Sequence, residues 1–133
     1  MPVELEMSLR LLLAAALGAI IGYQRERAGK PAGLRTHVLI CLGAALFTVA
    51  SAFGFTGTVD PTRIAAGIVT GIGFLGAGAI LHREGGIVAG LTTAATIWVV
   101  AAIGLAAGAG LYLMSAVATA LVLIVLFLPH PIR

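Results

Sequence analysis

Long stretches without a charged residue divide this chain into a few apolar segments. The uncharged runs cover residues 11–24, 38–59, 64–81 and 87–128. A single helix over 87–128 would measure about 63 Å, whereas the hydrocarbon core of a bilayer is about 30 Å thick. This run is therefore expected to fold back once, at Gly108–Gly110, because glycine tolerates the backbone angles of a tight turn. The pattern predicts five helical membrane spans, at about residues 7–23, 38–57, 62–81, 91–107 and 111–128.

The amino-acid composition also indicates a membrane protein. The 133 residues are 60% hydrophobic and 10% charged, with a mean hydropathy of +1.12, whereas soluble domains are about 45–50% apolar and about 25% charged. The lipid bilayer is therefore the expected surrounding. A single cysteine, Cys41, excludes an internal disulfide scaffold, and the scattered basic residues argue against nucleic-acid binding. The sequence lacks the alternation of apolar and polar residues that the strands of a membrane β-barrel show. The predicted fold class is therefore all-α, a polytopic five-helix transmembrane bundle. It is expected to form one domain over 1–133, with no soluble C-terminal domain.

The basic residues predict an orientation. Six of the eight lysines and arginines fall on one side of the predicted spans, four of them in the first loop, and only Arg10 and Arg63 fall on the other. Because cytoplasmic loops carry the excess of basic residues, the first loop is expected in the cytoplasm. The N-terminus is then outside and the C-terminus inside.

Small residues are expected to form the helix contacts. Three glycine pairs have the four-residue spacing that places both members on one helix face: Gly18 and Gly22, Gly67 and Gly71, and Gly104 and Gly108. This spacing indicates tight helix packing, within the chain or between subunits.

The third span is unusually rich in glycine, with Gly71, Gly73, Gly76 and Gly78 following Gly67. Glycine costs about 1 kcal/mol of helix propensity relative to alanine, so this density permits a helix broken at mid-membrane that would turn backbone groups toward a ligand. A continuous helix packed on every side is the alternative.

Polar chemistry is confined to the ends of the spans. Asp60 and Arg63 begin the third span, where a carboxylate suits a helix N-terminus. Threonines begin the fourth span, and their hydroxyls are expected to bond carbonyls of their own helix. Trp98, further along that span, is expected to be a packing residue rather than a headgroup anchor. The residues that could converge into a charged cluster on the cytoplasmic side are Arg25, Glu26, Arg35, His37, Arg83 and Glu84. Thr92 and Thr93 are further functional candidates at the start of the fourth span.

The sequence offers few metal ligands and no catalytic set. Magnesium takes oxygen ligands and one or two carboxylates, for which Asp60 and Glu84 are the candidates, so Mg²⁺ is possible and no cofactor is required. No Ser–His–Asp set, Cys–His pair or metal-ligand spacing is visible. The chain is therefore not expected to be an enzyme, and a lipid-modifying enzyme in particular would lack a nucleophile.

Four motifs in order resemble the MgtC/SapB family of bacterial inner-membrane proteins. They are the segments 31–37 (PAGLRTH), 62–66 (TRIAA), 71–78 (GIGFLGAG) and 90–98, which contains GLTTAAT and Trp98. The resemblance implies a link to magnesium limitation, to virulence through survival inside host cells, and to control of membrane potential or ATP synthase. It also implies functional roles for Arg35, Asp60, Arg63, Glu84 and Thr92. The family often has glutamate where this chain has Gln24, and glutamine where it has Gly67.

Two functions remain open from the sequence. The first is a regulator that binds other membrane proteins and transports nothing itself, supported by the scarcity of charge within the spans and by the small-residue faces. The second is a magnesium or other small-ion transporter or channel that uses the glycine-rich third span. A homodimer, in which two such spans face each other, suits either function.

Overall fold

The computed structural model describes the chain except for residues 1, 56, 58–59, 61, 82–89 and 129–133. The described residues form five helices: α1 (Val3–Arg27), α2 (Leu34–Phe53), α3 (Thr62–Leu81), α4 (Leu91–Gly108) and α5 (Tyr112–Leu126). The predicted all-α fold is confirmed. Helices α1 to α4 are long and apolar enough to cross a membrane, whereas α5 is a shorter apolar helix of 15 residues.

Three of the five helices have bounds that differ from the predicted ones. Helix α1 is longer at both ends than residues 7–23, because Glu4 and Glu6 in its first turn and Arg25 and Arg27 in its last turn suit the helix dipole. Helix α2 begins at Leu34 and ends at Phe53, four residues earlier at each end than expected. Helix α5 is shorter than 111–128 by one residue at its start and two at its end.

The predicted turn between the fourth and fifth spans is confirmed. Helix α4 ends at Gly108 and α5 begins at Tyr112. Between them Gly110 has a φ of +87°, which is costly for any residue with a Cβ. The N–H of Leu111 donates to the carbonyl of Ala106 over 2.9 Å and so closes the end of α4.

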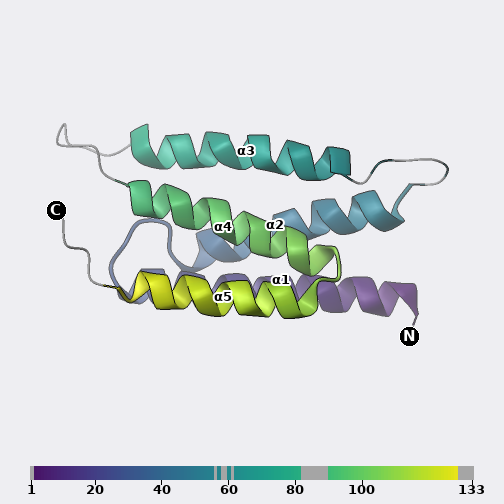
Figure 1. The fold of residues 1–133 in the computed structure, drawn as a ribbon, viewed down its shortest axis with the longest axis horizontal. Helices are drawn as coiled ribbons and strands as arrows, with labels where there is room; N and C mark the ends of the chain where they lie inside the picture. The colour runs from purple at the N-terminus through teal and green to yellow at the C-terminus, as the bar shows by residue number, and fades with distance from the viewer. Residues whose placement is uncertain (1, 56, 58–59, 61, 82–89, 129–133) are drawn as a thin grey trace.

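The helices lie side by side, with α4 between α3 and α5 and with α1 and α2 behind them (Figure 1). The buried core comes from α1, α2 and α4, and it includes Ile21, Cys41, Val100 and Ile103. The start of α1 and the end of α5 lie at opposite ends of the bundle. Helix α3 lies at the edge and packs mainly on α4.

Two of the three glycine pairs bring helices into close contact within the chain. A methyl group at Gly18 would lie 2.7 Å from the carbonyl oxygen of His37, and one at Gly22 would lie 2.8 Å from Cα of Leu34. Both contacts join α1 to the backbone of α2. In α4, a methyl group at Gly104 would overlap the carbonyl of Cys41 in α2. In lipid, where the hydrophobic drive between helices is weak, such close approach of backbones is what holds helices together.

Candidate functional site

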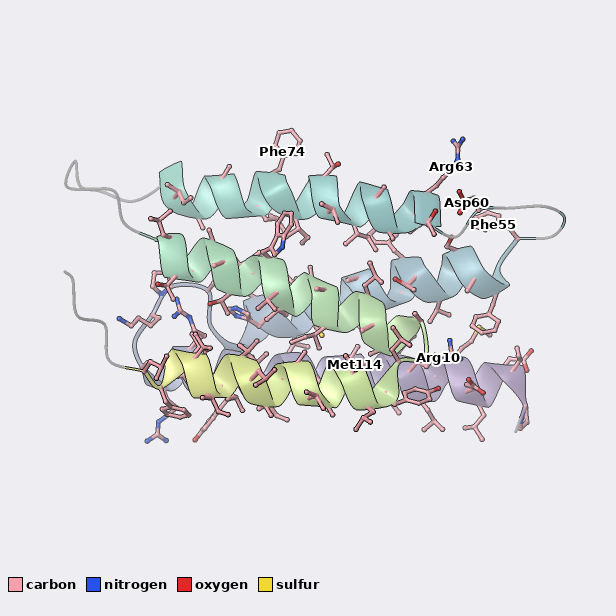
Figure 2. The ribbon with its side chains drawn as sticks, in the orientation of Figure 1. Arg10, Phe55, Asp60, Arg63, Phe74 and Met114 are labelled. Atoms are coloured by element: carbon pink, nitrogen blue, oxygen red, sulfur yellow. The ribbon has the colours of Figure 1, made fainter. Side chains whose placement is uncertain are left out.

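The glycine-rich segment forms one unbroken helix that is not packed on every side. Added methyl groups at Gly67, Gly71 and Gly78 would meet no atom of a neighbouring helix within 4 Å. Phe74, on the same side of α3, is 79% exposed and points away from the bundle (Figure 2). We call Gly67, Gly71, Phe74 and Gly78 the outer glycine face, because spacings of four, three and four residues place them along one side of a helix.

The other two glycines of α3 lie on different sides of the helix. Gly76 is buried against α4, where an added methyl group would lie 3.6 Å from Cβ of Ala94. Gly73 has open space, about 200° around the helix from Gly71. The expectation of a helix packed on all sides is therefore wrong. Helix α3 packs on α4 along its Gly76 side and has a smaller contact with α2, and the described residues leave the outer glycine face uncovered.

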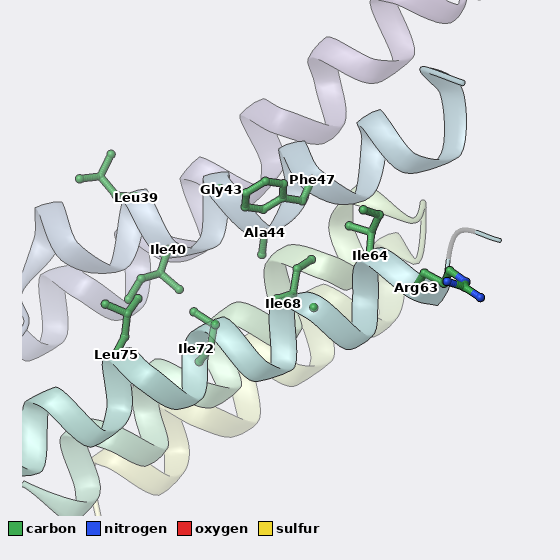
Figure 3. Close-up of a pocket in the computed structure, with 12 residues that line it drawn as sticks. Leu39, Ile40, Gly43, Ala44, Phe47, Arg63, Ile64, Ile68, Ile72 and Leu75 are labelled. Carbon is green, nitrogen blue, oxygen red and sulfur yellow. The ribbon is translucent and has the colours of Figure 1, made fainter. Parts of the chain in front are cut away.

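An apolar groove separates α3 from α2 (Figure 3). It has a volume of about 580 Å³, and its walls are apolar apart from Arg63 at one end. The lining residues on α2 are Leu39, Ile40, Gly43, Ala44 and Phe47, and those on α3 are Arg63, Ile64, Gly67, Ile68, Gly71, Ile72 and Leu75.

Asp60 stabilises the beginning of α3, as its position predicted. Its carboxylate accepts hydrogen bonds from the N–H of Thr62 at 3.0 Å and from the Thr62 hydroxyl at 2.6 Å. These bonds favour the charged form and lower the pKa of Asp60. Arg63 is exposed, and its guanidinium has no ion-pair or hydrogen-bonding partner elsewhere in the described chain.

At the opposite end of the bundle the structure brings together part of the predicted charged cluster. Arg25 in α1 is only 3% exposed, and its guanidinium donates a hydrogen bond to the hydroxyl of Thr93 in α4. His37 in α2 is fully buried, and its Nδ1 donates to the carbonyl of Gly33 over 2.9 Å. The end of α1 is thereby fixed to the start of α4.

Other members of that predicted cluster lie apart from it. Glu26 accepts a hydrogen bond from the N–H of Leu34 at 3.0 Å and so stabilises the start of α2. Arg35 and Thr92 are exposed, and Arg83 and Glu84 lie outside the described residues. Thr96 donates to the carbonyl of Thr92 as expected.

Two further residues of α4 were considered from the sequence. The Thr93 hydroxyl accepts a hydrogen bond from Arg25, because α1 ends directly opposite, and the carbonyl four residues before it lies outside the described residues. Trp98, expected to be a packing residue, is 52% exposed.

Some polar atoms near Arg25 have no hydrogen-bonding partner among the described residues. They are Nε of Arg25, Nε2 of His37 and Oε1 of Gln24. Gln24 is one of the two departures from the resembled family, and the other, Gly67, has open space around it. Within the described chain, no three His, Cys, Asp or Glu residues come together as a metal-binding group.

A second polar network, around Arg10, was not predicted as a site. Its guanidinium donates to the carbonyl of Gly108 at 2.9 Å and to the hydroxyl of Tyr112 at 3.1 Å, and it pairs with Glu6. The ring of Phe53 lies 5.0 Å from the guanidinium carbon. This network ties α1 to the turn between α4 and α5. The four-residue spacing of Glu6 and Arg10 was the one signal of it in the sequence.

A bundle of long apolar helices, with its polar groups gathered at the helix ends, defines a multi-pass helical membrane protein. Comparison with known proteins places it more narrowly. The chain belongs to the MgtC family, whose sequence model matches residues 11–133. The predicted family resemblance is thus confirmed.

Three relatives illustrate the match. The chain is 50% identical over 132 residues to "Putative magnesium transporter YhiD" of Escherichia coli K12, an alignment that covers 94% of this chain and 61% of that protein. It is 50% identical over 119 residues to protein MgtC of Brucella abortus, covering 90% of this chain and 49% of the relative. It is 42% identical over 136 residues to protein SrpB of Synechococcus elongatus, covering 92% of this chain and 74% of that protein.

The chain therefore spans about half to three fifths of the length of the first two relatives. No solved structure matches it.

Proposed function

We propose that this protein is a membrane-embedded regulator that binds a transmembrane helix of another protein through the outer glycine face of α3. In this proposal it responds to magnesium limitation and carries no ion itself. The magnesium link comes from the family resemblance and from the name of the relative YhiD.

The observation that carries the proposal is the contrast among the three glycine pairs. Gly18 with Gly22 and Gly104 with Gly108 lie against the backbone of α2, where no Cβ fits. Gly67 and Gly71 have the same spacing, and an added methyl group at either would meet no atom within 4 Å. Small residues at this spacing let two helices approach closely in lipid, so a helix from outside the chain is the natural partner for the third pair.

Several further assignments belong to the same proposal. We place the protein in the bacterial inner membrane with its N-terminus outside and its C-terminus in the cytoplasm, and with α5 crossing the membrane as the fifth span. A homodimer through the outer glycine face is one form of the contact, and a helix of another complex, such as ATP synthase, is the other. No enzymatic role is proposed.

Transport of magnesium or another small ion is the second candidate, favoured by the name of YhiD. The features of α3 give it less support. The helix is unbroken, and the groove beside it has apolar walls with a cationic side chain at its end. Magnesium in a pathway needs oxygen ligands, and Asp60 is engaged by Thr62.

Magnesium uptake into proteoliposomes separates the two functions. The purified protein is reconstituted around a trapped magnesium dye, beside the variants Gly71→Leu and Gly73→Leu. Both glycines have open space, so both variants should fold, and only Gly71 belongs to the outer glycine face. A regulator gives no uptake above that of empty liposomes in any sample. Saturable uptake that is lost in Gly71→Leu would overturn the proposal and establish a transporter.

A cellular growth assay tests whether the outer glycine face is needed for the proposed regulatory function. In a host strain that lacks its own copy, the chain is expected to restore growth at low magnesium. Gly71→Leu should abolish this rescue, because a leucine side chain holds the two helices apart, while Gly73→Leu should preserve it. Equal growth of the two variants would contradict a role for the outer glycine face.

A further inference from the structure

The groove between α2 and α3 is long and apolar. Its 580 Å³ extend along α3 from Arg63 to Leu75, about 18 Å at 1.5 Å per residue. An extended hydrocarbon chain is an occupant whose shape and chemistry suit such a space.

The walls of the groove also suit a hydrocarbon chain. Apart from Arg63 the lining is aliphatic or aromatic, with Leu39 and Phe47 from α2 and Ile68 and Leu75 from α3. Gly43 and Gly71 contribute no side chain and leave open space at the two walls. At membrane depth an empty apolar space forfeits dispersion contacts along its whole lining, and acyl chains are the apolar molecules at hand.

The charge at the end of the groove indicates which kind of lipid fits. The Arg63 guanidinium is exposed and has no partner within the described chain. It lies in the first turn of α3, where the helix dipole also favours an anion. Asp60 is the nearby anion, and its carboxylate is already bonded twice by Thr62. A phosphate group placed at Arg63 is therefore at the correct depth for a lipid headgroup whose tail enters the groove.

We propose that the groove between α2 and α3 holds one acyl chain of an anionic phospholipid, with the lipid phosphate paired to Arg63. The bound lipid fixes the position of α3, which has few contacts with α2. Gly67 and Gly71 border both the groove and the outer glycine face, whereas Gly43 lies on α2 and lines the groove alone. Gly43→Leu is therefore the variant that tests this site apart from that face.

The test is native mass spectrometry of protein extracted from vesicles of phosphatidylglycerol and phosphatidylcholine with identical acyl chains. The wild-type protein is expected to retain one phosphatidylglycerol. Gly43→Leu fills the groove from the α2 side, where the added side chain has space, and should abolish retention. Arg63→Gln should reduce the preference for phosphatidylglycerol about fivefold, the ratio that corresponds to about 1 kcal/mol for one basic residue at a membrane surface.

Two further variants make the result decisive. Gly71→Leu blocks the same groove from the α3 side and should also lose the lipid, so the conclusion does not depend on the folding of one variant. Gly73→Leu adds the same side chain outside the groove and should retain the lipid as the wild type does.

Equal lipid retention by the wild type, Gly43→Leu and Gly71→Leu would overturn the proposal. An unchanged lipid preference in Arg63→Gln would overturn the assignment of the headgroup. A dimer that becomes monomeric in Gly43→Leu without loss of lipid would show that a second copy covers the groove instead.

Discussion

Replacing Gly104 with alanine is expected to destabilise the bundle, although alanine is the better helix former. The added methyl group would overlap the Cys41 carbonyl oxygen and lie 2.9 Å from its carbonyl carbon. Ordinary contacts of a Cβ begin at 3.4 Å, so α4 and α2 must separate by at least 0.5 Å at this point. Both contacting groups belong to the backbone of α2, and no side chain can rotate away to relieve them.

The size of the effect follows from comparison with Gly67→Ala in α3. Both changes gain the same helix propensity, up to about 1 kcal/mol, and Gly67 has open space around it. The difference between the two variants is therefore the cost of overpacking, about 1–3 kcal/mol. Because α2 also packs against α1, the displacement spreads into the core, and a value in the upper half of that range is expected.

The single cysteine provides the assay. Cys41 is fully buried, so a thiol-reactive dye labels the protein only when the bundle opens. The wild type, Gly104→Ala and Gly67→Ala are titrated with SDS in mixed micelles, and the labelled fraction is followed. Gly104→Ala should open at clearly lower SDS than the other two. The same midpoint for both alanine variants would refute the close contact of α2 and α4.

Three other predictions follow from the polar groups at the helix ends. Thr93→Val removes the hydrogen-bond acceptor of buried Arg25 and should lower the free energy of unfolding by about 1–3 kcal/mol in the same SDS titration. Thr92→Val, at an exposed position, should cause no measurable loss of stability. Equal losses in the two variants would contradict the buried hydrogen bond. Arg10→Gln removes the hydrogen bonds between α1 and the α4–α5 turn and should increase the rate of amide hydrogen exchange in that turn about tenfold. An unchanged exchange rate would contradict the polar network around Arg10. The pKa of Asp60 is lowered in the fold, so its ionised form should contribute stability above the unfolded pKa of about 3.9, and this contribution should disappear as the pH falls through the lower folded value. A carbon-13 titration of the Asp60 carboxyl should find a midpoint below 3.9, and a midpoint at or above it would refute the hydrogen bonds that hold it.

The sequence predicted the architecture well because the bilayer restricts the solutions. Runs without charge locate helices, and a run twice the membrane thickness must turn, which the structure shows at Gly110. The helix ends were harder to predict, because charged residues at both ends of α1 continue the helix rather than stop it.

Spacing alone could not say which glycines pack inside the chain. Gly18, Gly67 and Gly104 each begin a pair with the same spacing, and only the arrangement of the helices shows that the Gly67 pair has open space around it. The burial of Arg25 could not be predicted from the sequence either, because its hydrogen-bonding partner Thr93 is 68 residues away. The bonds from Arg10 to the far end of α4 span 98 residues or more and leave no local pattern.

The central claim is that the outer glycine face of α3 binds a helix from outside the chain, and photocrosslinking from this face tests it directly. Phe74 is replaced by p-benzoylphenylalanine, which keeps the aromatic ring, and cells are irradiated with the protein in its native membrane. Leu113 on α5 is 75% exposed and carries the same probe as the control. We predict a protein adduct from position 74, with the mass of a second copy or of a partner subunit, and adducts only with lipid from position 113. Lipid adducts alone from both positions would contradict the account.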